Sequence, residues 1–508
     1  MGEMKSLETL DMSSNGLSGQ LPKLLLIGCY SLVFLKLSNN RFQGDIFSEH
    51  ANLTSLRYLY LDGNNFDGSV GEGLLNSEEL MLLDVSDNSF SGMFPLWIGG
   101  MLGLQFLYMN GNQLKGPFPH QLQSGLLKVL DISHNNFSGS IARDVNFSST
   151  LRVLSLQNNE FMGSVPDSFF KAEALEILDL RNNNFSGNIL NITDVSSSLL
   201  VLLLRNNSLQ SHIPEKLCQL SKVGLLDLSH NKFKGAIPSC LGNMSFGAKD
   251  YVGILDFLPS HGDFLAENSY FPSWINTSAL NLYATEIGPA LDKETDVDFV
   301  TKTRYETYQG DFLHFMYGLD LSSNQLSGEI PVEIWDLQAI KSLNFSRNRL
   351  TGSIPYNISK LKNLESLDLS NNKLYGNIPP VVADLNSLGY FNVSCNNFSG
   401  EIPFKGHLVT FDERSYIGNA HLCGLPTNIS CNPSRVPKAS APTHAKEEED
   451  DVIDMEWFYW TCGAVYISTF LALLTFLCID TRWSREWFYR VDFFIRHLQR
   501  YKRSSLCN

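Results

Sequence analysis

The feature that most constrains the fold of this chain is an asparagine that returns at a nearly constant interval. The segment Leu319–Pro331, LDLSSNQLSGEIP, is repeated with small changes on both sides. The recurring asparagines are Asn15, Asn40, Asn64, Asn88, Asn112, Asn135, Asn159, Asn183, Asn207, Asn231, Asn324, Asn348, Asn372 and Asn396. Their spacing is interrupted by one long step, between Asn231 and Asn324. A chain with this register is expected to fold as a stack of similar units.

One unit shows how the repeat is built. In Leu56–Asn64, LRYLYLDGN, leucines at alternate positions point to one side of a short strand and the residues between them point to the other. The pattern L-x-x-L-x-L-x-x-N at a period of about 20–29 residues is the signature of leucine-rich repeats. No unit buries its own leucines, so neighbouring units must stack. The sequence therefore predicts an α/β, right-handed leucine-rich-repeat solenoid with a parallel sheet on its concave face.

The recurring asparagines have a predicted structural role. An amide side chain both donates and accepts hydrogen bonds, so it can bond backbone groups where the chain leaves each strand. Repeated from coil to coil, these side chains form a buried row whose polar groups are satisfied. We call the fourteen residues the ladder asparagines.

The outward positions of the strands are candidate ligand contacts. Aromatic and polar side chains on a rigid exposed face are suited to anchoring a peptide or protein. The candidates are Tyr58, Tyr60, Phe106, Tyr108, Arg152 and Gln157. The alternative is that each is an ordinary solvated strand position, and the pattern alone does not exclude it.

The repeats are interrupted once, and the pattern ends before the C-terminus. Ten repeats occupy 1–244, an insertion 245–312, four repeats 313–403 and a cap 404–431. They are followed by a linker with an acidic run, 432–456, an apolar segment, 457–479, and a basic tail, 480–508. The insertion is rich in aromatic residues, which argues against plain disorder. Within it, Phe299–Tyr305 is predicted to form a strand that packs onto the sheet face.

The segment 457–479 carries no charged side chain. It is long enough for one transmembrane helix, which needs about 20 apolar residues to cross about 30 Å of hydrocarbon. Acidic residues precede it and Arg482, Arg485 and Arg490 follow it, so the repeats are predicted to lie outside and the C-terminus in the cytosol. Ala464, Ser468 and Ala472 form one small-residue stripe on which a second helix could pack, or a chance pattern.

The N-terminus differs from that of a secreted protein. The repeats begin directly after Met1, without an apolar signal region. We therefore expect the sequence to be an N-terminally truncated form.

Glycosylation sequons and cysteine pairs indicate the cellular compartment in which the chain folds. The Asn-x-Ser/Thr sites are Asn52, Asn136, Asn146, Asn184, Asn191, Asn206, Asn243, Asn276, Asn344, Asn357, Asn392, Asn397 and Asn428. They indicate a glycosylated ectodomain, although an Asn- and Ser-rich repeat also creates sequons by chance. Cys218 with Cys240, and Cys423 with Cys431, are spaced to close short loops in an oxidising compartment or to remain as buried thiols.

The sequence contains no recognisable catalytic constellation. It has neither a phosphate-binding glycine loop with its lysine, nor G-x-S-x-G, nor H-E-x-x-H. The eleven histidines are scattered, and the net charge of -15 argues against a nucleic-acid partner. We therefore expect a binding protein that is not an enzyme and needs no metal or cofactor.

The order of these features resembles that of plant leucine-rich-repeat receptor-like proteins. The resemblance rests on the L-D-L-S-x-N-x-L-x-G-x-I-P repeat, the insertion before the last four repeats, the Leu-Cys-Gly-x-Pro cap, the acidic run and one C-terminal span. Lys302-Thr-Arg-Tyr, followed by Met316-Tyr-Gly-Leu-Asp-Leu, also matches the family's passage from the insertion to the final repeats.

This resemblance implies a plasma-membrane receptor of single-pass type I topology without a kinase. The concave face and the insertion, including Lys302, Arg304 and Tyr305, are then implied to contact the ligand. The last repeats are implied to recruit a SERK-type co-receptor kinase. The span, with the acidic run 447–451, is implied to pair with an adaptor receptor-like kinase. The family also pairs cysteines as Cys218–Cys240 and Cys423–Cys431.

The leading hypothesis is a receptor subunit that recognises an extracellular peptide, protein or microbial molecule in defence. The alternatives are a developmental peptide co-receptor, an inhibitor-like module that blocks a wall-degrading enzyme, and a decoy or non-functional truncated product.

Overall fold

The computed structural model describes residues 4–47, 52–119, 125–143, 145, 148–189, 198–244, 246, 297–301, 304–308 and 316–431. All of them belong to one compact unit, residues 1–433. The predicted linker, span and tail lie outside the described residues. Among the helices that are described, none is long and apolar enough to cross a membrane.

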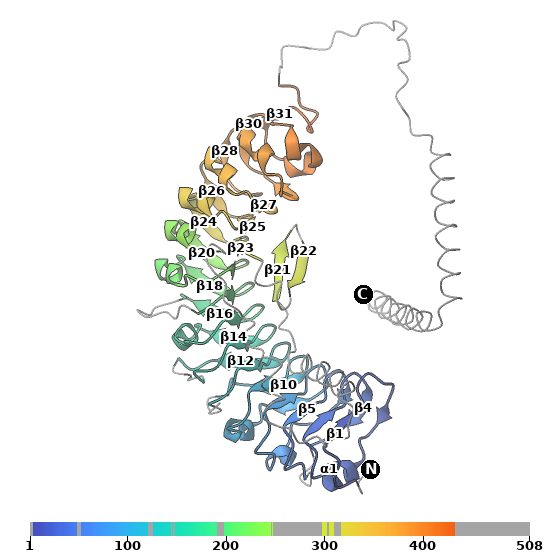
Figure 1. The fold of residues 1–508 in the computed structure, drawn as a ribbon. Coiled ribbons are helices and arrows are strands. Elements are labelled where there is room, and N and C mark those ends of the chain that lie inside the picture. Colours follow the sequence, from blue (N-terminus) through green and yellow to red (C-terminus); the bar gives the residue numbers. More distant parts are fainter. Residues whose placement is uncertain are drawn as a thin grey trace, which may run out of the picture. The chain divides into compact units, whose positions relative to one another are not determined.

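One strand from each coil contributes to a 14-stranded parallel sheet (Figure 1). Its strands, in order, are β1 (Thr9–Asp11), β3 (Phe34–Lys36), β5 (Tyr58–Tyr60), β7 (Leu82–Asp84), β9 (Phe106–Tyr108), β11 (Val129–Asp131), β13 (Val153–Ser155), β15 (Ile177–Asp179), β17 (Val201–Leu203), β19 (Leu225–Asp227), β23 (Gly318–Asp320), β25 (Ser342–Asn344), β27 (Ser366–Asp368) and β29 (Tyr390–Asn392). Equivalent residues pair across neighbouring strands, as in Leu154 with Leu178. The predicted leucine-rich-repeat solenoid is confirmed.

A second set of short strands forms where each coil turns away from the sheet. Nine of them pair as β8 (Ser91–Met93), β10 (Gln113–Gly116), β12 (Asn136–Ser140), β14 (Glu160–Gly163), β16 (Asn184–Gly187), β18 (Ser208–Ser211), β20 (Lys232–Gly235), β24 (Gln325–Glu329) and β26 (Arg349–Thr351). Two three-stranded groups flank them, β2 (Ser18–Gly19), β4 (Arg41–Gly44) and β6 (Asn65–Phe66), and β28 (Tyr375–Gly376), β30 (Asn397–Glu401) and β31 (His421–Cys423).

Short helices complete the coils. They are α1 (Lys23–Gly28) and the single 3-10 turns η1 (Glu72–Leu74), η2 (Leu96–Gly100), η3 (Asp167–Phe170), η4 (Glu215–Gln219), η5 (Ser239–Asn243), η8 (Val332–Asp336), η9 (Tyr356–Lys360), η10 (Pro380–Asp384), η11 (Gly406–Thr410) and η12 (Glu413–Ser415). Several follow a proline, whose fixed φ and missing N–H suit the start of a helical turn.

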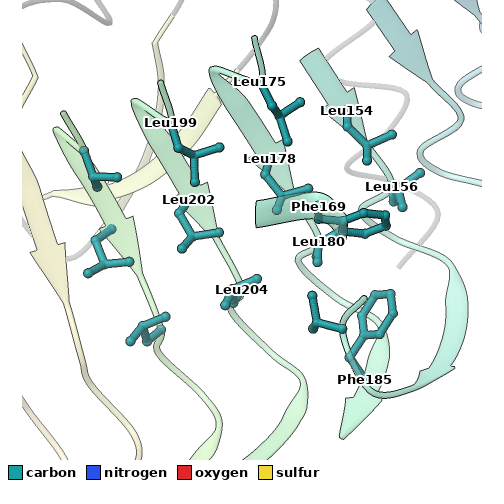
Figure 2. Packing of buried hydrophobic residues seen from close by; sticks show 14 of the residues in the cluster. Leu154, Leu156, Phe169, Leu175, Leu178, Leu180, Phe185, Leu199, Leu202 and Leu204 are labelled. Carbon is teal, nitrogen blue, oxygen red and sulfur yellow. The ribbon is translucent and has the colours of Figure 1, made fainter. Parts of the chain in front are cut away.

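The core is a row of equivalent side chains from successive coils. Leu154 and Leu178, on adjacent strands, are fully buried, and Leu180 continues the row beyond the strand (Figure 2). On the opposite side of the coil, the rings of Phe161 and Phe185 stack with centroids 6.2 Å apart. Each coil thus covers the apolar side chains of the next, which accounts for the stacking that the sequence predicts.

The ladder asparagines from Asn40 to Asn396 bond as predicted, whereas Asn15 in the first coil bonds within its own turn. The Asn159 Nδ2 donates to the carbonyl oxygens of Ile132 and Leu156 at 3.0 and 3.1 Å. Its Oδ1 accepts from the backbone N–H of Phe137 at 3.0 Å. One side chain therefore ties its own coil to the preceding one through both of its amide atoms. The same set recurs at Asn348, which bonds Leu321, Phe345 and Ser346 and accepts from Leu326.

The sheet continues across the insertion without a gap in pairing. β19 pairs directly with β23, with Leu225 opposite Gly318 and Asp227 opposite Asp320. The coils on either side also meet at η5 and η8, where a Cβ on Gly242 would lie 2.3 Å from the backbone carbon of Glu333. The tenth and eleventh repeats therefore stack directly on each other, with a close backbone approach at Gly242.

The insertion contributes a β-hairpin. β21 (Val297–Thr301) pairs antiparallel with β22 (Arg304–Tyr308). The sequence predicted one strand over Phe299–Tyr305, and that is wrong in its extent, because the chain reverses between Thr301 and Arg304. The prediction that this segment packs onto the sheet face is confirmed by the contacts described below.

Candidate ligand-binding face

The sheet presents an apolar column on the face that points away from the core. One residue per strand builds it from β3 to β19, and equivalent positions lie on adjacent parallel strands about 4.8 Å apart. The column residues are Phe34, Tyr58, Leu82, Phe106, Val129, Val153, Ile177, Val201 and Leu225. They form a continuous row that crosses nine strands, and all of them except Phe106 are buried, with no more than 7% of each residue exposed.

The aromatic candidates lie at the N-terminal end of this face. Tyr58, Tyr60 and Tyr108 are only 7%, 5% and 4% exposed, so the expectation of solvent-exposed anchors is not met. The Phe34 ring lies 6.3 Å from that of Tyr58 and 5.7 Å from that of Tyr60. Close neighbours on adjacent strands account for this enclosure. Burial raises the pKa of Tyr58 to about 12, with Arg57 opposing the rise.

The remaining candidates differ in their surroundings. Phe106 is half-buried, and the Lys128 Nζ lies 5.7 Å from its ring centroid. Arg152 forms an ion pair with Glu176, Nη1 to Oε1 3.1 Å. Gln157 is 9% exposed, and its Oε1 has no hydrogen-bond partner among the described residues.

The three candidates from the insertion are only partly described. The backbones of Arg304 and Tyr305 belong to β22. Lys302 lies outside the described residues, as do the side chains of the other two.

The hairpin packs onto the sheet through an apolar contact. Phe299 is fully buried, and a Cβ on Gly318 would lie 2.4 Å from its ring. Gly318 occupies the column position of β23, so the missing side chain makes room for the ring. Val297 joins the same cluster as Leu203, which lies on β17.

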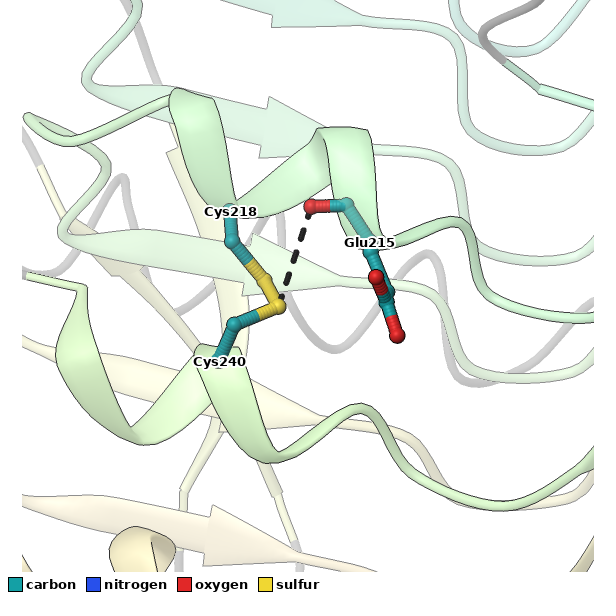
Figure 3. Close-up of a disulfide and its surroundings, with 3 residues drawn as sticks. All are labelled: Glu215, Cys218 and Cys240. Atoms are coloured by element: carbon teal, nitrogen blue, oxygen red, sulfur yellow. Dashed lines mark hydrogen bonds between the residues drawn. A yellow bond between two sulfur atoms is a disulfide. The ribbon is translucent and has the colours of Figure 1, made fainter.

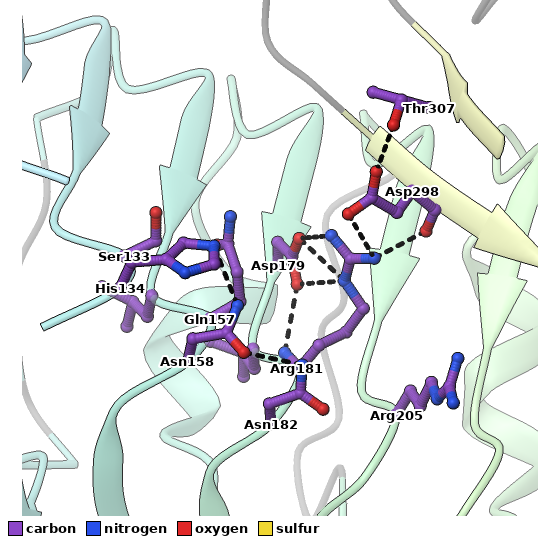
Figure 4. A network of polar contacts seen from close by, with 12 residues as sticks. Ser133, His134, Gln157, Asn158, Asp179, Arg181, Asn182, Arg205, Asp298 and Thr307 are labelled. Atoms are coloured by element: carbon purple, nitrogen blue, oxygen red, sulfur yellow. Dashed lines mark hydrogen bonds and ion pairs between the residues drawn. The ribbon is translucent and has the colours of Figure 1, made fainter. Parts of the chain in front are cut away.

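An arginine fixes the hairpin at a second point (Figure 4). Arg181 donates from Nε and Nη2 to the carboxylate of Asp179, at 2.9 and 2.6 Å. Its Nη1 donates to the backbone oxygen of Asp298 on β21 at 2.6 Å and lies 3.6 Å from that residue's carboxylate. The Asp298 Oδ1 also accepts from the hydroxyl of Thr307 on β22 at 2.6 Å. The hairpin therefore spans the face from the β15 coil to β23.

These contacts were not predicted from the sequence. A signal was available, because Arg181 replaces the serine of L-D-L-S in its repeat, and Gly318 replaces the usual column side chain. The pattern marks such positions as exceptional but does not say which distant residue meets them.

Beyond the hairpin, the sheet face is polar. Ser342 and Ser366 continue the column on β25 and β27. The neighbouring positions carry Asn344 and Asp368, and the Asn344 Nδ2 donates to Asp320 at 3.0 Å. The face therefore has an apolar part and a polar part, with the hairpin between them.

The other predicted sites are distributed along the described coils. Exposed sequon asparagines are Asn52, Asn136, Asn184, Asn206, Asn243, Asn357, Asn397 and Asn428, whereas Asn344 and Asn392 are half-buried on the sheet. Asn146, Asn191 and Asn276 lie outside the described residues, as do the acidic run 447–451 and the stripe of Ala464, Ser468 and Ala472. In the part of the chain that is described, no cluster of three His, Cys, Asp or Glu could hold a metal ion.

Both cysteine pairs are disulfides. Cys218 on η4 and Cys240 on η5 join successive coils, with Cα atoms 5.8 Å apart (Figure 3). Cys423 on β31 and Cys431 close a short loop in the C-terminal cap, with Cα atoms 5.0 Å apart.

Stacked coils of similar length, the ladder asparagines and one continuous parallel sheet together define a leucine-rich-repeat domain. Models of the leucine-rich repeat match residues 6–26, 55–77, 126–147, 150–172, 174–193, 224–244 and 317–337, and a two-copy repeat model matches 338–382. The crystal structure of a TDR receptor is similar in fold, with a TM-score of 0.53 and 23% identity, covering 78% of this chain and 65% of that one.

The relatives narrow this class to a family. Receptor-like protein 1 of Arabidopsis thaliana is 66% identical over 454 residues, which cover 87% of this chain and 42% of that protein. Receptor-like protein 9a of the same plant is 52% identical over 262 residues, which cover 51% of this chain and 28% of that protein. The chain belongs to the plant leucine-rich-repeat receptor-like proteins. It spans less than half the length of these relatives.

Proposed function

We propose that this chain is the binding part of a cell-surface receptor that lacks a kinase and recognises an extracellular peptide, protein or microbial ligand in defence. The repeats would lie outside the plasma membrane, with 457–479 as the single span and the C-terminus in the cytosol. The two disulfides and the eight exposed sequons support an oxidising extracytosolic compartment. We also propose that the chain binds without catalysing a reaction and without a cofactor.

The observation that carries this proposal is the apolar column on the sheet face. On the side of the hairpin toward the N-terminus, from β5 to β13, it crosses five strands, or about 19 Å at the usual strand spacing. An extended peptide advances about 3.4 Å per residue, so about six residues would cover this part of the column. The side chains of alternate peptide residues would pack against its residues, and the hairpin would bound the ligand at one end.

The ligand experiment uses the full chain in lipid nanodiscs and an arrayed library of 12-residue peptides. We expect that replacing both Val129 and Val153 by Glu weakens binding of the enriched peptides at least about tenfold, because two charges would be desolvated against apolar groups. Met162→Glu is the control, since Met162 lies on β14, outside the sheet face, and is 46% exposed. Equal binding by the native chain and the double variant would refute the column as the ligand site.

The signalling part of the proposal concerns two kinases. An adaptor receptor-like kinase would pack on the stripe of Ala464, Ser468 and Ala472, and a SERK-type co-receptor kinase would bind the last repeats. Co-precipitation of the native chain from plant cells tests both. If changing all three stripe residues to Leu leaves the adaptor association intact, the stripe is not its interface.

A further inference from the structure

Two carboxyl groups lie face to face on the sheet beside the docked hairpin. Asp227 on β19 and Asp320 on β23 are directly opposite each other in the parallel pairing, and each is 1% exposed. The Asp227 Oδ1 accepts from the backbone N–H and hydroxyl of Ser229, at 2.9 and 2.6 Å. The Asp320 carboxylate accepts from the Ser322 backbone N–H and from Asn344. Like charges at such positions destabilise a sheet.

The hairpin lies across the strands that carry this pair. Two consecutive residues of β21 make the contacts. Asp298 bonds Arg181 of the β15 coil, and Phe299 packs on Gly318 of β23. Gly318 and Asp320 are two residues apart on one strand and therefore share a face. Docking of the hairpin thus removes water from the part of the face where the two carboxyl groups lie.

Two guanidinium groups, those of Arg205 and Arg181, lie near the pair, and both attract the carboxylate of Asp227. Arg181 donates from Nε and Nη2 to the carboxylate of Asp179, and from Nη1 to the backbone oxygen of Asp298 on β21. The β17 coil brings Arg205, which attracts both carboxylates. Asn344 on β25 is neutral. β22 carries Glu306 and Tyr308, which add no positive charge, and Arg304, whose side chain lies outside the described residues. Burial lowers the pKa of His230, on the β19 coil, and Arg205 and Arg347 lower it further, so this imidazole is neutral near pH 7.

We propose that docking of the β21–β22 hairpin onto the sheet takes up one proton, shared by Asp227 and Asp320, so that acidic medium holds the hairpin in place and neutral medium loosens it. This goes beyond ligand binding, because it concerns the state of the face before any ligand arrives. It makes the hairpin a pH-sensitive part of the receptor.

The direction of the effect follows from the carboxyl environment. Burial raises the pKa of Asp320 to about 7, and the charge of Asp227 adds to the rise. Burial also raises the pKa of Asp227. A carboxyl with a raised pKa binds its proton more tightly in the docked state than in water. The docking constant is therefore greatest at low pH and falls, by at most about tenfold per pH unit, as the pH rises toward about 7.

Hydroxyl-radical footprinting of the full chain in nanodiscs, from about pH 5 to about pH 8, tests this proposal. Phe299 is the reporter, because its ring is fully buried by docking, and Phe161 in the repeat core reports on unfolding. We expect the modification rate of Phe299 to rise at least about tenfold over this range, while that of Phe161 stays constant. A Phe299 rate that does not change with pH would overturn the proposal.

Substitutions then assign the proton. Replacing both Asp227 and Asp320 by Asn should give a Phe299 rate that is low and independent of pH. Asn fits there, because Asn344 occupies the equivalent position on β25. Asp368→Asn is the matched control, since Asp368 lies two strands beyond Asp320 at the equivalent position and is half-buried. It should keep the native profile.

Two results of this comparison would refute the assignment. One is a double variant that still shows the native rise, and the other is an Asp368 variant that loses it. If the double variant exposes Phe161, the single Asp320→Asn variant is used in its place. The Phe299 modification rate of this single variant should then depend less on pH than that of the native chain. A full native rise in this rate would count against the Asp227–Asp320 pair.

Discussion

Each coil holds one residue in a conformation that most side chains avoid. The position before the ladder asparagine has a positive φ in every described repeat, including 54° at Ser323 and 55° at Arg347, and it is glycine in two repeats, at Gly63 and Gly111. This left-handed turn lets the ladder amide reach backward to the preceding coil. The sequence pattern shows the position only as variable, because Ser, Asn, Asp, His, Arg and Cys all occupy it.

Ser323 allows a test of this strain. Replacing it by Val should lower the free energy of unfolding by about 1–2 kcal/mol, because a β-branched residue fits poorly at positive φ. Ser323→Gly should leave stability unchanged or raise it slightly. Denaturant unfolding measures both, and equal effects of the two variants would show that φ is not the cause.

The ladder asparagine itself makes the larger contribution. Asn348→Ala should cost about 3 kcal/mol or more, because it leaves backbone groups of two coils without partners. Asn15→Ala is the control, since the exposed amide of Asn15 donates to Met12 and Ser13 of its own turn and, among the described residues, to no other coil. Thermal unfolding should show a clearly smaller loss for the control, and similar losses would contradict the ladder account.

At the scale of elements, the repeat strands and their pairing could be predicted because they obey one local rule. The hairpin could be predicted only in part. Alternating residues at Phe299–Tyr305 indicate extended structure, but they do not show where the chain reverses. Nor could the sequence show that Phe299 meets Gly318, since that contact depends on where the insertion returns to the sheet.

The Cys218–Cys240 disulfide belongs to this scale because it clamps the last coils before the insertion. Closing a loop with a sequence separation of 22 contributes about 3 kcal/mol in the chain-entropy view. The Cys218→Ala/Cys240→Ala variant should therefore lower the stability of this region by about that amount. Limited proteolysis near η4 and η5 measures the change. Unaltered cleavage rates would mean that packing alone holds these coils.

At the scale of the whole described unit, stability depends on unbroken contact between neighbouring coils. The tenth and eleventh repeats approach each other closely at Gly242, where even a Cβ would overlap the Glu333 backbone. Gly242→Ala should therefore weaken the junction, so that the two blocks of repeats unfold in separate steps.

Calorimetry distinguishes the outcomes of the Gly242 test. In the native chain, the two blocks of repeats should unfold together. In the variant, an additional unfolding transition should appear at a lower temperature. Gly100→Ala is the control, because nothing lies within 4 Å of the Cβ position there. A variant that melts in the same way as the control would show that the junction tolerates the added carbon.

The limits of sequence reasoning are also clearest at this scale. The spacing of the asparagines predicted the stack of coils and its interruption, and the resemblance to receptor-like proteins predicted which cysteines pair. The division of the face into an apolar and a polar part emerged only once the strands were placed side by side. The enclosure of Tyr58 and Tyr60 likewise results from neighbours one coil away.

The direct pairing of β19 with β23 has a consequence for how such a chain can change over time. The coils on both sides of the insertion meet as they would without it, and the entropy cost of a longer loop grows only slowly with its length. The insertion can therefore be lengthened, shortened or replaced with little effect on the stack that carries it. Recognition can diversify in one segment while the scaffold is inherited intact.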